Sequence, residues 1–265
     1  MSNEPTVQQL FDLSGKTALI SGASGYLGGT FSRALAEAGA NVICTSRDLG
    51  RAEEAAAALP QPGDARHHAV VLDHMDEASL FQGFEDALES AGQIDILINN
   101  GHEAIGHDWT DATGEEFTRQ QANATGYFLL ARRLREHLVE RGTRGSVVML
   151  GSMYGQVGSY PDTYAGVSTA SPVAYHCLKG GIIHLTRHLA VYWAADGVRV
   201  NCLSPGPFPN PTSNQEMVAR LESKSPLRRM GLPHELKGTL LLLVSDAGSY
   251  ITGENITVDG GWTAW

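Results

Sequence analysis

The stretch that decides the fold of this chain is residues 16–29, Lys16-Thr17-Ala18-Leu19-Ile20-Ser21 followed by Gly22-Ala23-Ser24-Gly25-Tyr26-Leu27-Gly28-Gly29. The first six residues are mostly apolar and predict a short buried strand. The glycines come next, and a helical pattern of apolar residues follows at 31–38. A glycine-rich turn between a strand and a helix lets backbone N–H groups approach a pyrophosphate. The stretch therefore predicts a dinucleotide-binding turn, in which Gly22 bends the chain and Gly28 lets the helix pack on the strand.

Strand-like runs alternate with helical patterns along the rest of the chain. We predict further strands at 41–46, 67–72, 94–99, 146–151, 198–203 and 256–258. Apolar strands that alternate with helices imply a parallel sheet covered on both faces. No repeat or composition break marks a second domain. The sequence thus predicts one α/β domain over 1–265, a doubly wound parallel sheet of about seven strands, with a polar lead at 1–14.

Composition and charge argue against several classes of protein. The 265 residues carry a formal net charge of −10, which disfavours nucleic acid or an anionic membrane as the main partner. The three cysteines are far apart and predict reduced thiols rather than a disulfide framework. The first residues have neither a basic nor a long apolar run, so we expect no secretory signal, a cytoplasmic location and a small-molecule partner.

The end of the second predicted strand is where a dinucleotide-binding fold contacts the adenosine ribose. The chain has Ser46-Arg47-Asp48 there. An arginine can pair with a 2′-phosphate and favours NADP, whereas an acid at the strand tip favours NAD. Because Arg47 comes first and Ser46 adds a second donor, we predict NADP as the preferred cofactor and NAD as the alternative. Asp48 either contacts the ribose or caps the helix that begins near Leu49.

Tyr175 and Lys179 stand four residues apart in a segment, 171–195, whose apolar residues have helical spacing. Residues four apart share one face of a helix, so the phenol and the ammonium can point to one place. A nearby cation favours phenolate, and we expect Lys179 to lower the pKa of Tyr175. Such a tyrosine can pass a proton to or from a substrate oxygen. The spacing alone also fits a half-buried ring beside a solvated amine.

Further motifs follow in one order along the chain. They are Asn99-Asn100-Gly101, Asn123, Ser152, Tyr175 with Lys179, Arg199-Val200-Asn201, Pro205-Gly206, and the stretches 226–229, 250–253 and 258–261. With the glycine turn, they make the chain resemble the single-domain branch of the short-chain dehydrogenase/reductase family from residue 11 to residue 262. The resemblance implies a three-layer Rossmann fold and an NAD(P)-dependent oxidoreductase, assembled as a homodimer or homotetramer.

The resemblance assigns a role to each of four residues. Tyr175 is expected to protonate the carbonyl oxygen as hydride arrives, or to act as the base in the oxidation direction. Ser152 is expected to hydrogen-bond the same oxygen, and Lys179 to hold the nicotinamide ribose. Asn123 is expected to hold a water that links Lys179 to bulk solvent. A non-catalytic dinucleotide sensor, the alternative from another class, requires a broken set, and all four residues are present.

The expected cofactor contacts extend along the predicted cleft. By resemblance, Asp73 and His74 contact the adenine, Asn100 and Gly101 line the adenosine side, and Asn210 replaces a threonine that binds the carboxamide. The full expected set is Gly22, Ser24, Gly25, Tyr26, Leu27, Gly28, Ser46, Arg47, Asp73, His74, Asn100, Gly101, Tyr175, Lys179, Pro205, Gly206, Phe208 and Asn210.

Besides Asn210, two further departures from the family pattern fall in the expected site. Tyr26 stands where the family usually has a glycine, so the pyrophosphate approach falls to Gly25. The Tyr26 ring is then either turned away or lies across the mouth of the cofactor cleft. Gly101-His102 stands where the family has Ala-Gly, which places an imidazole where family members have no side chain.

Substrate specificity is expected in the segment before the catalytic tyrosine. Tyr175 follows Ser152 by 23 residues, more than in most of the family. The extra segment, 153–171, is rich in Tyr, Gly, Ser and Thr, which suits a sugar or a sugar acid, although a surface loop has a similar composition. We expect residues 207–225 to form a lid over the substrate. The expected substrate contacts are His102, Tyr154 and Phe208, with Trp109 as a further candidate for the pocket wall.

Two other patterns carry no chemistry. His184 and His188 stand four apart but have no third ligand, so we predict no metal. Tyr164 is followed four residues later by Ser168 rather than by a lysine, which excludes it as the catalytic tyrosine. The leading prediction is an NADP(H)-preferring oxidoreductase that interconverts a carbonyl and an alcohol on a small polar, sugar-like molecule. A 3-oxoacyl thioester reductase is the alternative, and it would need a more apolar lid and a basic patch.

Overall fold

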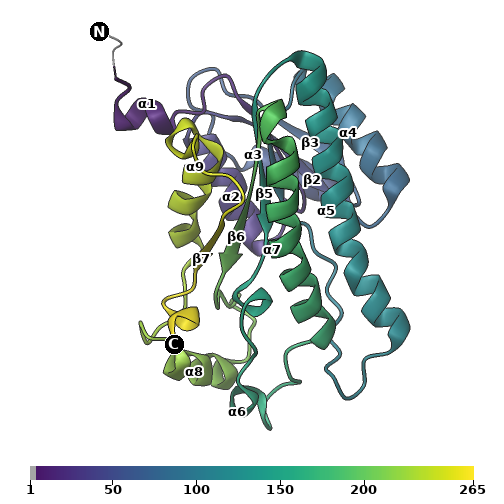
Figure 1. Ribbon diagram of the computed structural model, residues 1–265, viewed down its shortest axis with the longest axis vertical. Coiled ribbons are helices and arrows are strands. Elements are labelled where there is room, and N and C mark those ends of the chain that lie inside the picture. Colours follow the sequence, from purple (N-terminus) through teal and green to yellow (C-terminus); the bar gives the residue numbers. More distant parts are fainter. Residues whose placement is uncertain (1–3) are drawn as a thin grey trace.

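A seven-stranded parallel sheet forms the centre of the molecule (Figure 1). The computed structural model describes residues 4–265. The strands are β1 (Thr17–Ile20), β2 (Asn41–Ser46), β3 (His67–Val71), β4 (Ile96–Asn99), β5 (Gly145–Leu150), β6 (Val198–Pro205) and β7 (Asn255–Val258). All seven predicted strands are present, with ends within two residues of those predicted. The predicted doubly wound, three-layer Rossmann fold is confirmed.

Helices connect the strands as predicted. They are α1 (Val7–Phe11), α2 (Tyr26–Glu37), α3 (Leu49–Ala57), α4 (Glu77–Ala91), α5 (Gly114–Arg141), α6 (Pro161–Tyr164), α7 (Val173–Trp193), α8 (Gln215–Lys224) and α9 (Lys237–Val244). Of the polar lead at 1–14, residues 1–3 lie outside the described residues, and α1 occupies its middle. No helix among residues 4–265 is long and apolar enough to cross a membrane.

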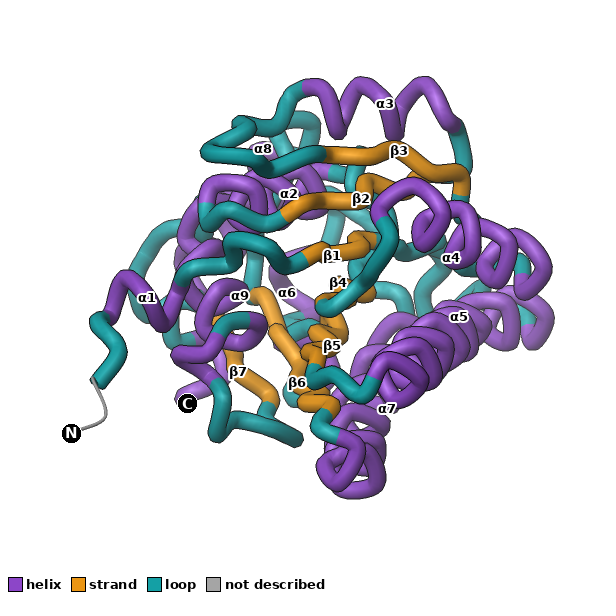
Figure 2. The backbone as a smooth tube through the Cα atoms, turned by 90° about the horizontal axis from the view of Figure 1, so that it is seen from above, coloured by secondary structure: helices purple, strands orange, loops and turns teal. Residues whose placement is uncertain are grey.

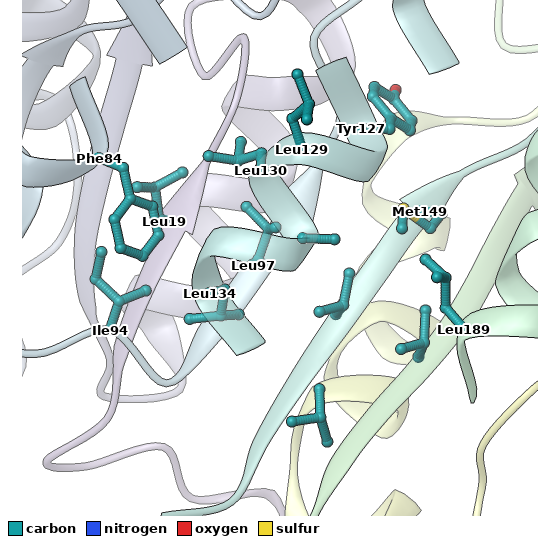
Figure 3. Packing of buried hydrophobic residues seen from close by; sticks show 14 of the residues in the cluster. Leu19, Phe84, Ile94, Leu97, Tyr127, Leu129, Leu130, Leu134, Met149 and Leu189 are labelled. Atoms are coloured by element: carbon teal, nitrogen blue, oxygen red, sulfur yellow. The ribbon is translucent and has the colours of Figure 1, made fainter. Parts of the chain in front are cut away.

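Two apolar layers bury the sheet from opposite sides (Figure 2). Helices α4, α5 and α7 cover one face, where Leu97 of β4 lies in one buried cluster with Phe84 and Leu134 (Figure 3). Helices α2, α3 and α9 cover the other face, where Phe31 and Leu240 belong to a second cluster. Because both faces are covered, the strands are apolar throughout instead of alternating.

The chain reverses its direction of winding between β1 and β4, which are neighbours in the strand order β3-β2-β1-β4-β5-β6-β7. Such a reversal opens a crevice at the carboxyl ends of the two strands, where ligands bind in this class of fold. The side-chain amide of Asn100, just beyond β4, donates to the backbone oxygens of Ser21 and Gly22, at 3.1 and 3.0 Å. The glycine turn is thus held at the crevice by the neighbouring strand.

Candidate active site

A cleft of about 480 Å³ opens at the carboxyl ends of the strands. Sixteen of the expected cofactor contacts line it: Gly22, Ser24, Gly25, Tyr26, Leu27, Gly28, Ser46, Arg47, His74, Asn100, Gly101, Tyr175, Lys179, Pro205, Gly206 and Phe208. The other two do not line it. The Asp73 carboxylate accepts the backbone N–H of Met75, and the side-chain oxygen of Asn210 accepts the backbone N–H of Thr212. The structure therefore places neither Asp73 nor Asn210 at the cleft wall.

The glycine turn has the geometry that a pyrophosphate site needs. Gly22 has a φ of +67°, in the left-handed region that favours glycine. A Cβ on Gly28 would lie 2.1 Å from the backbone oxygen of Gly22, so no larger residue fits there without a shift. The first turn of α2 faces the cleft and presents backbone N–H groups to it. The residues present thus fit a dinucleotide.

Tyr26 lies across the mouth of the cofactor cleft, which is the second of the two predicted positions. Its side chain is 43% exposed, and its hydroxyl donates to the backbone oxygen of Pro209 at 3.1 Å. Residues 26 and 209 are far apart in the sequence, so this hydrogen bond joins the glycine turn to the predicted lid. The segment predicted as the lid begins without regular secondary structure after β6 and continues into α8.

The adenosine end of the cleft is basic. Arg47 and Arg51 both line it, together with Ser46. Asp48 is turned to the helix, because its carboxylate accepts the backbone N–H of Arg51 at 2.9 Å as the N-cap of α3. The capping role considered for Asp48 is therefore the one observed. Arg51 was not among the predicted contacts, and it lies in the first turn of α3, just beyond Arg47.

One carboxylate contact reaches Arg47 across the cleft. Glu103, beyond β4, pairs with Arg47 at 3.4 Å and with Arg119 of α5 at 2.5 Å. Glu103 also lines the cleft. No short motif indicates Glu103, because its position depends on the path of the loop between β4 and α5.

Ser152, Tyr175 and Lys179 come together at the inner end of the cleft. Ser152 follows the end of β5, and the other two residues share one face of α7. The Lys179 ammonium is buried, donates to the backbone oxygen of Leu150 at 2.7 Å, and lies 5.5 Å from the ring centroid of Tyr175. The four-residue spacing therefore places the Tyr175 phenol and the Lys179 ammonium side by side at the inner end of the cleft.

The expected direction of the Tyr175 pKa shift is wrong for this structure. Burial raises the pKa of the Tyr175 phenol above its ordinary value, and only the Ser152 hydroxyl acts in the opposite direction. Burial also lowers the pKa of Lys179 to about 8. Desolvation thus dominates at both groups, because each is deep in the protein and disfavours its charged form.

Asn123 is buried in α5, and its side chain is fully used by the protein. Its oxygen accepts from His74 Nε2 at 2.9 Å and from the backbone N–H of Glu103 at 2.8 Å. Its nitrogen donates to the backbone oxygens of Glu103 and Gln120. A side-chain amide makes four hydrogen bonds, so a relay water can contact Asn123 only through its backbone.

A second cavity of about 410 Å³ adjoins the cleft. The three expected substrate contacts, His102, Tyr154 and Phe208, line it, and so do Ser152 and Tyr175. Its outer wall is apolar and comes from Ile105, Pro172, Pro207, Pro209, Met217 and Leu221. Trp109 does not line this cavity and is 76% exposed, so the structure does not place it in the pocket wall.

The segment 153–171 supplies hydroxyl groups to this second cavity. Tyr154 and Tyr164 line it and join their hydroxyls at 2.6 Å. Ser171 also lines it and accepts or donates a bond to His176 at 2.9 Å. Burial raises the pKa of Tyr154 far above its ordinary value, so its hydroxyl stays neutral.

Comparisons with known proteins agree with this geometry. The model of the family described as enoyl-(acyl carrier protein) reductase matches residues 22–263. D-arabinitol 2-dehydrogenase (ribulose-forming) of Scheffersomyces stipitis is 33% identical, and 96% of each chain is covered. NADP-dependent mannitol dehydrogenase of Alternaria alternata is also 33% identical, over 97% of this chain and 95% of that one. The crystal structure of a short-chain type dehydrogenase/reductase from Mycobacterium marinum has a TM-score of 0.86 and 33% identity, over 98% of this chain and 100% of that one.

Proposed function

The chain belongs to the short-chain dehydrogenase/reductase family, and from this premise we propose that it interconverts a secondary alcohol and a ketone on a small neutral polyol, with NADP(H) as the preferred cofactor. One observation carries the proposal. Tyr175 and Ser152 line both the cofactor cleft and the adjoining cavity. Two hydroxyls at this junction can hold a substrate oxygen while the carbon that bears it faces the cofactor.

Proton transfer is assigned to Tyr175. Because its raised pKa keeps the phenol protonated near neutral pH, Tyr175 is ready to donate to a ketone oxygen in the reduction direction. Ser152 donates a hydrogen bond to the same oxygen and stabilises the charge that develops there. The nicotinamide, when bound, supplies the hydride. The Lys179 ammonium, 5.5 Å from the Tyr175 ring centroid, compensates the charge of the phenolate that remains.

Two arginines support NADP(H) as the preferred cofactor. Arg47 and Arg51 line the adenosine end of the cleft, and a guanidinium matches a phosphate with paired hydrogen bonds. Asp48, the acid that would favour NAD, instead accepts a hydrogen bond from the N-terminus of α3. The name of the mannitol dehydrogenase relative, which is NADP-dependent, agrees with this assignment.

The lining of the second cavity favours a neutral substrate over a sugar acid. Among the described residues that line it there is no Lys, Arg, Asp or Glu. A carboxylate or phosphate held there would lack a cationic partner, which is costly in a partly desolvated pocket. Hydroxyls of Tyr154, Tyr164 and Ser171 suit the hydroxyls of a polyol. The relatives named as D-arabinitol and mannitol dehydrogenases support this substrate class.

A substrate panel tests the function. Purified protein is assayed with each nicotinamide cofactor against neutral polyols, ketoses, sugar acids, simple ketones and 3-oxoacyl thioesters, and the absorbance of the reduced cofactor is followed. We expect the highest kcat/KM for a neutral polyol or ketose with NADP(H). A higher kcat/KM for the sugar acids would contradict the neutral-substrate proposal.

A 3-oxoacyl thioester reductase remains the second candidate, because the lid is apolar on its inner side. Phe208, Met217 and Leu221 line the cavity and would suit an acyl chain. The description of the matching family model, enoyl-(acyl carrier protein) reductase, also names acyl carrier protein. The thioesters in the panel decide between the two candidates, since a preference for them would replace the polyol by an acyl substrate.

The arrangement of the whole protein is part of the proposal. We infer one domain, with 153–171 as the substrate-side insertion, 207–225 as the lid, and a cytoplasmic location. A homodimer or homotetramer is supported by two large apolar side chains on α7, Val191 and Tyr192, which are 77% and 68% exposed. Sedimentation velocity at several concentrations measures the assembly state, and a monomer throughout would refute it.

A further inference from the structure

We propose that His102 is a specificity-determining residue, whose Nδ1–H binds the oxygen on the carbon next to the reacting carbon. The protein then selects vicinal diols and α-hydroxy ketones over simple alcohols and ketones. The inference rests on the proposed function and adds a substrate class to it.

His102 lies where the cofactor cleft meets the second cavity. It follows Gly101 beyond β4 and lines both spaces, as Ser152 and Tyr175 do. Its ring meets the Tyr175 ring edge-on, with centroids 5.4 Å apart and planes at 78°. A substrate oxygen that is held by Tyr175 is therefore close to this imidazole.

The imidazole is neutral. His102 is open to the cleft, and desolvation by the protein around it lowers the pKa of His102 to about 3. The Lys179 ammonium and His74 act in the same direction. In a neutral imidazole one ring nitrogen donates and the other accepts, so the hydrogen-bond partner of one nitrogen fixes the role of the other.

Gln120 fixes the tautomer. Its side-chain oxygen accepts the backbone N–H of Ile105 at 2.8 Å, which sets the orientation of the buried amide. Its side-chain nitrogen can only donate, and it lies 3.4 Å from His102 Nε2 and 3.3 Å from the backbone oxygen of Glu103. Nε2 of His102 must therefore accept, and the proton of the ring lies on Nδ1.

This Nδ1–H forms no hydrogen bond within residues 4–265. His102 thus adds a third donor to the pocket, in which the Tyr175 and Ser152 hydroxyls already donate to the reacting oxygen of the substrate. Oxygens on adjacent carbons lie about one hydrogen-bond length apart, so a vicinal hydroxyl can accept from His102 while the reacting oxygen stays with the other two residues. A simple alcohol has no oxygen for this third donor.

Matched substrates test the proposal. Each pair differs by one vicinal hydroxyl, as in a vicinal butanediol and sec-butanol, or a vicinal cyclohexanediol and cyclohexanol. For His102→Ala we expect kcat/KM for the diols to fall about tenfold while kcat/KM for the mono-alcohols changes less than twofold. His102→Asn, which keeps a side-chain N–H, should recover part of the loss.

The ratio between the two members of a pair separates specificity from damage to the fold. If His102 had only a structural role, its loss would lower kcat/KM equally for the diol and the mono-alcohol. Equal losses in His102→Ala would therefore overturn this inference alone. A wild-type protein that oxidises neither member of any pair would contradict the proposed function as well. Titration of NADPH fluorescence checks that cofactor binding is unchanged in both variants.

Discussion

Arg47, at the tip of β2, forms an ion pair with Glu103, beyond β4, with 3.4 Å between Nη1 and Oε2. The pair joins the two sides of the cofactor cleft at its adenosine end. Glu103 is held in place by Arg119, so its carboxylate is a fixed competitor for the guanidinium that we assign to the 2′-phosphate. On this assignment, binding of NADP(H) exchanges the Glu103 carboxylate for the 2′-phosphate as the partner of Arg47.

Replacing Arg47 by alanine should weaken NADP(H) selectively. The change removes a charge-assisted contact to the 2′-phosphate, and we expect KM for NADPH to rise about 10- to 100-fold. KM for NADH should change less than threefold, since NADH has no group for this arginine. Steady-state kinetics with both cofactors measures the two values, and equal increases would refute the assignment.

Glu103→Gln should have the opposite effect. The substitution keeps the shape of the side chain but removes the charge that competes for Arg47. We expect KM for NADPH to fall about two- to fivefold at low ionic strength, with a smaller gain at high salt, because exposed ion pairs are weak and screened. A rise in KM for NADPH would mean that Glu103 positions Arg47 instead of competing for it.

Tyr175→Phe should abolish turnover and leave cofactor binding nearly intact. The phenylalanine keeps the ring that packs against His102 but has no proton to donate. We expect kcat to fall at least about 10³-fold, with the Kd for NADPH within a factor of two to three. Steady-state assays measure kcat, and fluorescence titration measures the Kd for NADPH. Activity above a few per cent of wild type would sink the mechanism.

Lys179→Met should inactivate the protein and stabilise its fold. Burial lowers the pKa of Lys179 from 10.5 to about 8, so the folded state binds fewer protons than the unfolded state between these values. The free energy of unfolding of the wild type should therefore rise as pH rises through this window. The variant lacks this rise, and below pH 8 we expect it to be more stable by about 1–3 kcal/mol. Urea unfolding at several pH values measures both effects, and a wild type whose stability is flat with pH would contradict them.

Gly126→Ala in α5 should destabilise the protein by about 1–3 kcal/mol. A Cβ at this position would lie 2.0 Å from the backbone oxygen of His74, which cannot move without shifting the end of β3. Gly114→Ala is the matched control in the same helix, since a Cβ there would meet no atom within 4 Å beyond its chain neighbours and the nearby backbone of the helix. We expect the control to change stability by less than about 1 kcal/mol, in the stabilising direction. Similar losses in both variants would contradict the packing argument.

The fold follows from the sequence because each strand is an apolar run bounded by turn residues. Residues 41–46 were predicted as a strand and form β2 with the same ends. The cleft residues that stand within two residues of a strand end, such as Gly22, Arg47 and Ser152, could be placed because the carboxyl ends of parallel strands share one edge of the sheet.

Features that depend on distant segments could not be predicted from local pattern. The direction of the Tyr175 pKa shift is set by burial, which a spacing of four residues does not encode. Gln120 is a polar residue inside a long helix, and only the path of the loop after β4 brings His102 to it. Asn123 lies in α5, and the sequence does not indicate that its side-chain amide is occupied by that same loop.

The hydrogen bond from Tyr26 to Pro209 has a consequence for the order of events in a catalytic cycle. Tyr26 lines the cofactor cleft, while Pro209 lines the second cavity and Phe208 lines both. One wall of the second cavity is therefore fastened to the turn on which the dinucleotide rests. We therefore expect a dinucleotide bound at this turn to influence the shape of the pocket for its co-substrate, and the two to bind in a compulsory order with the dinucleotide first.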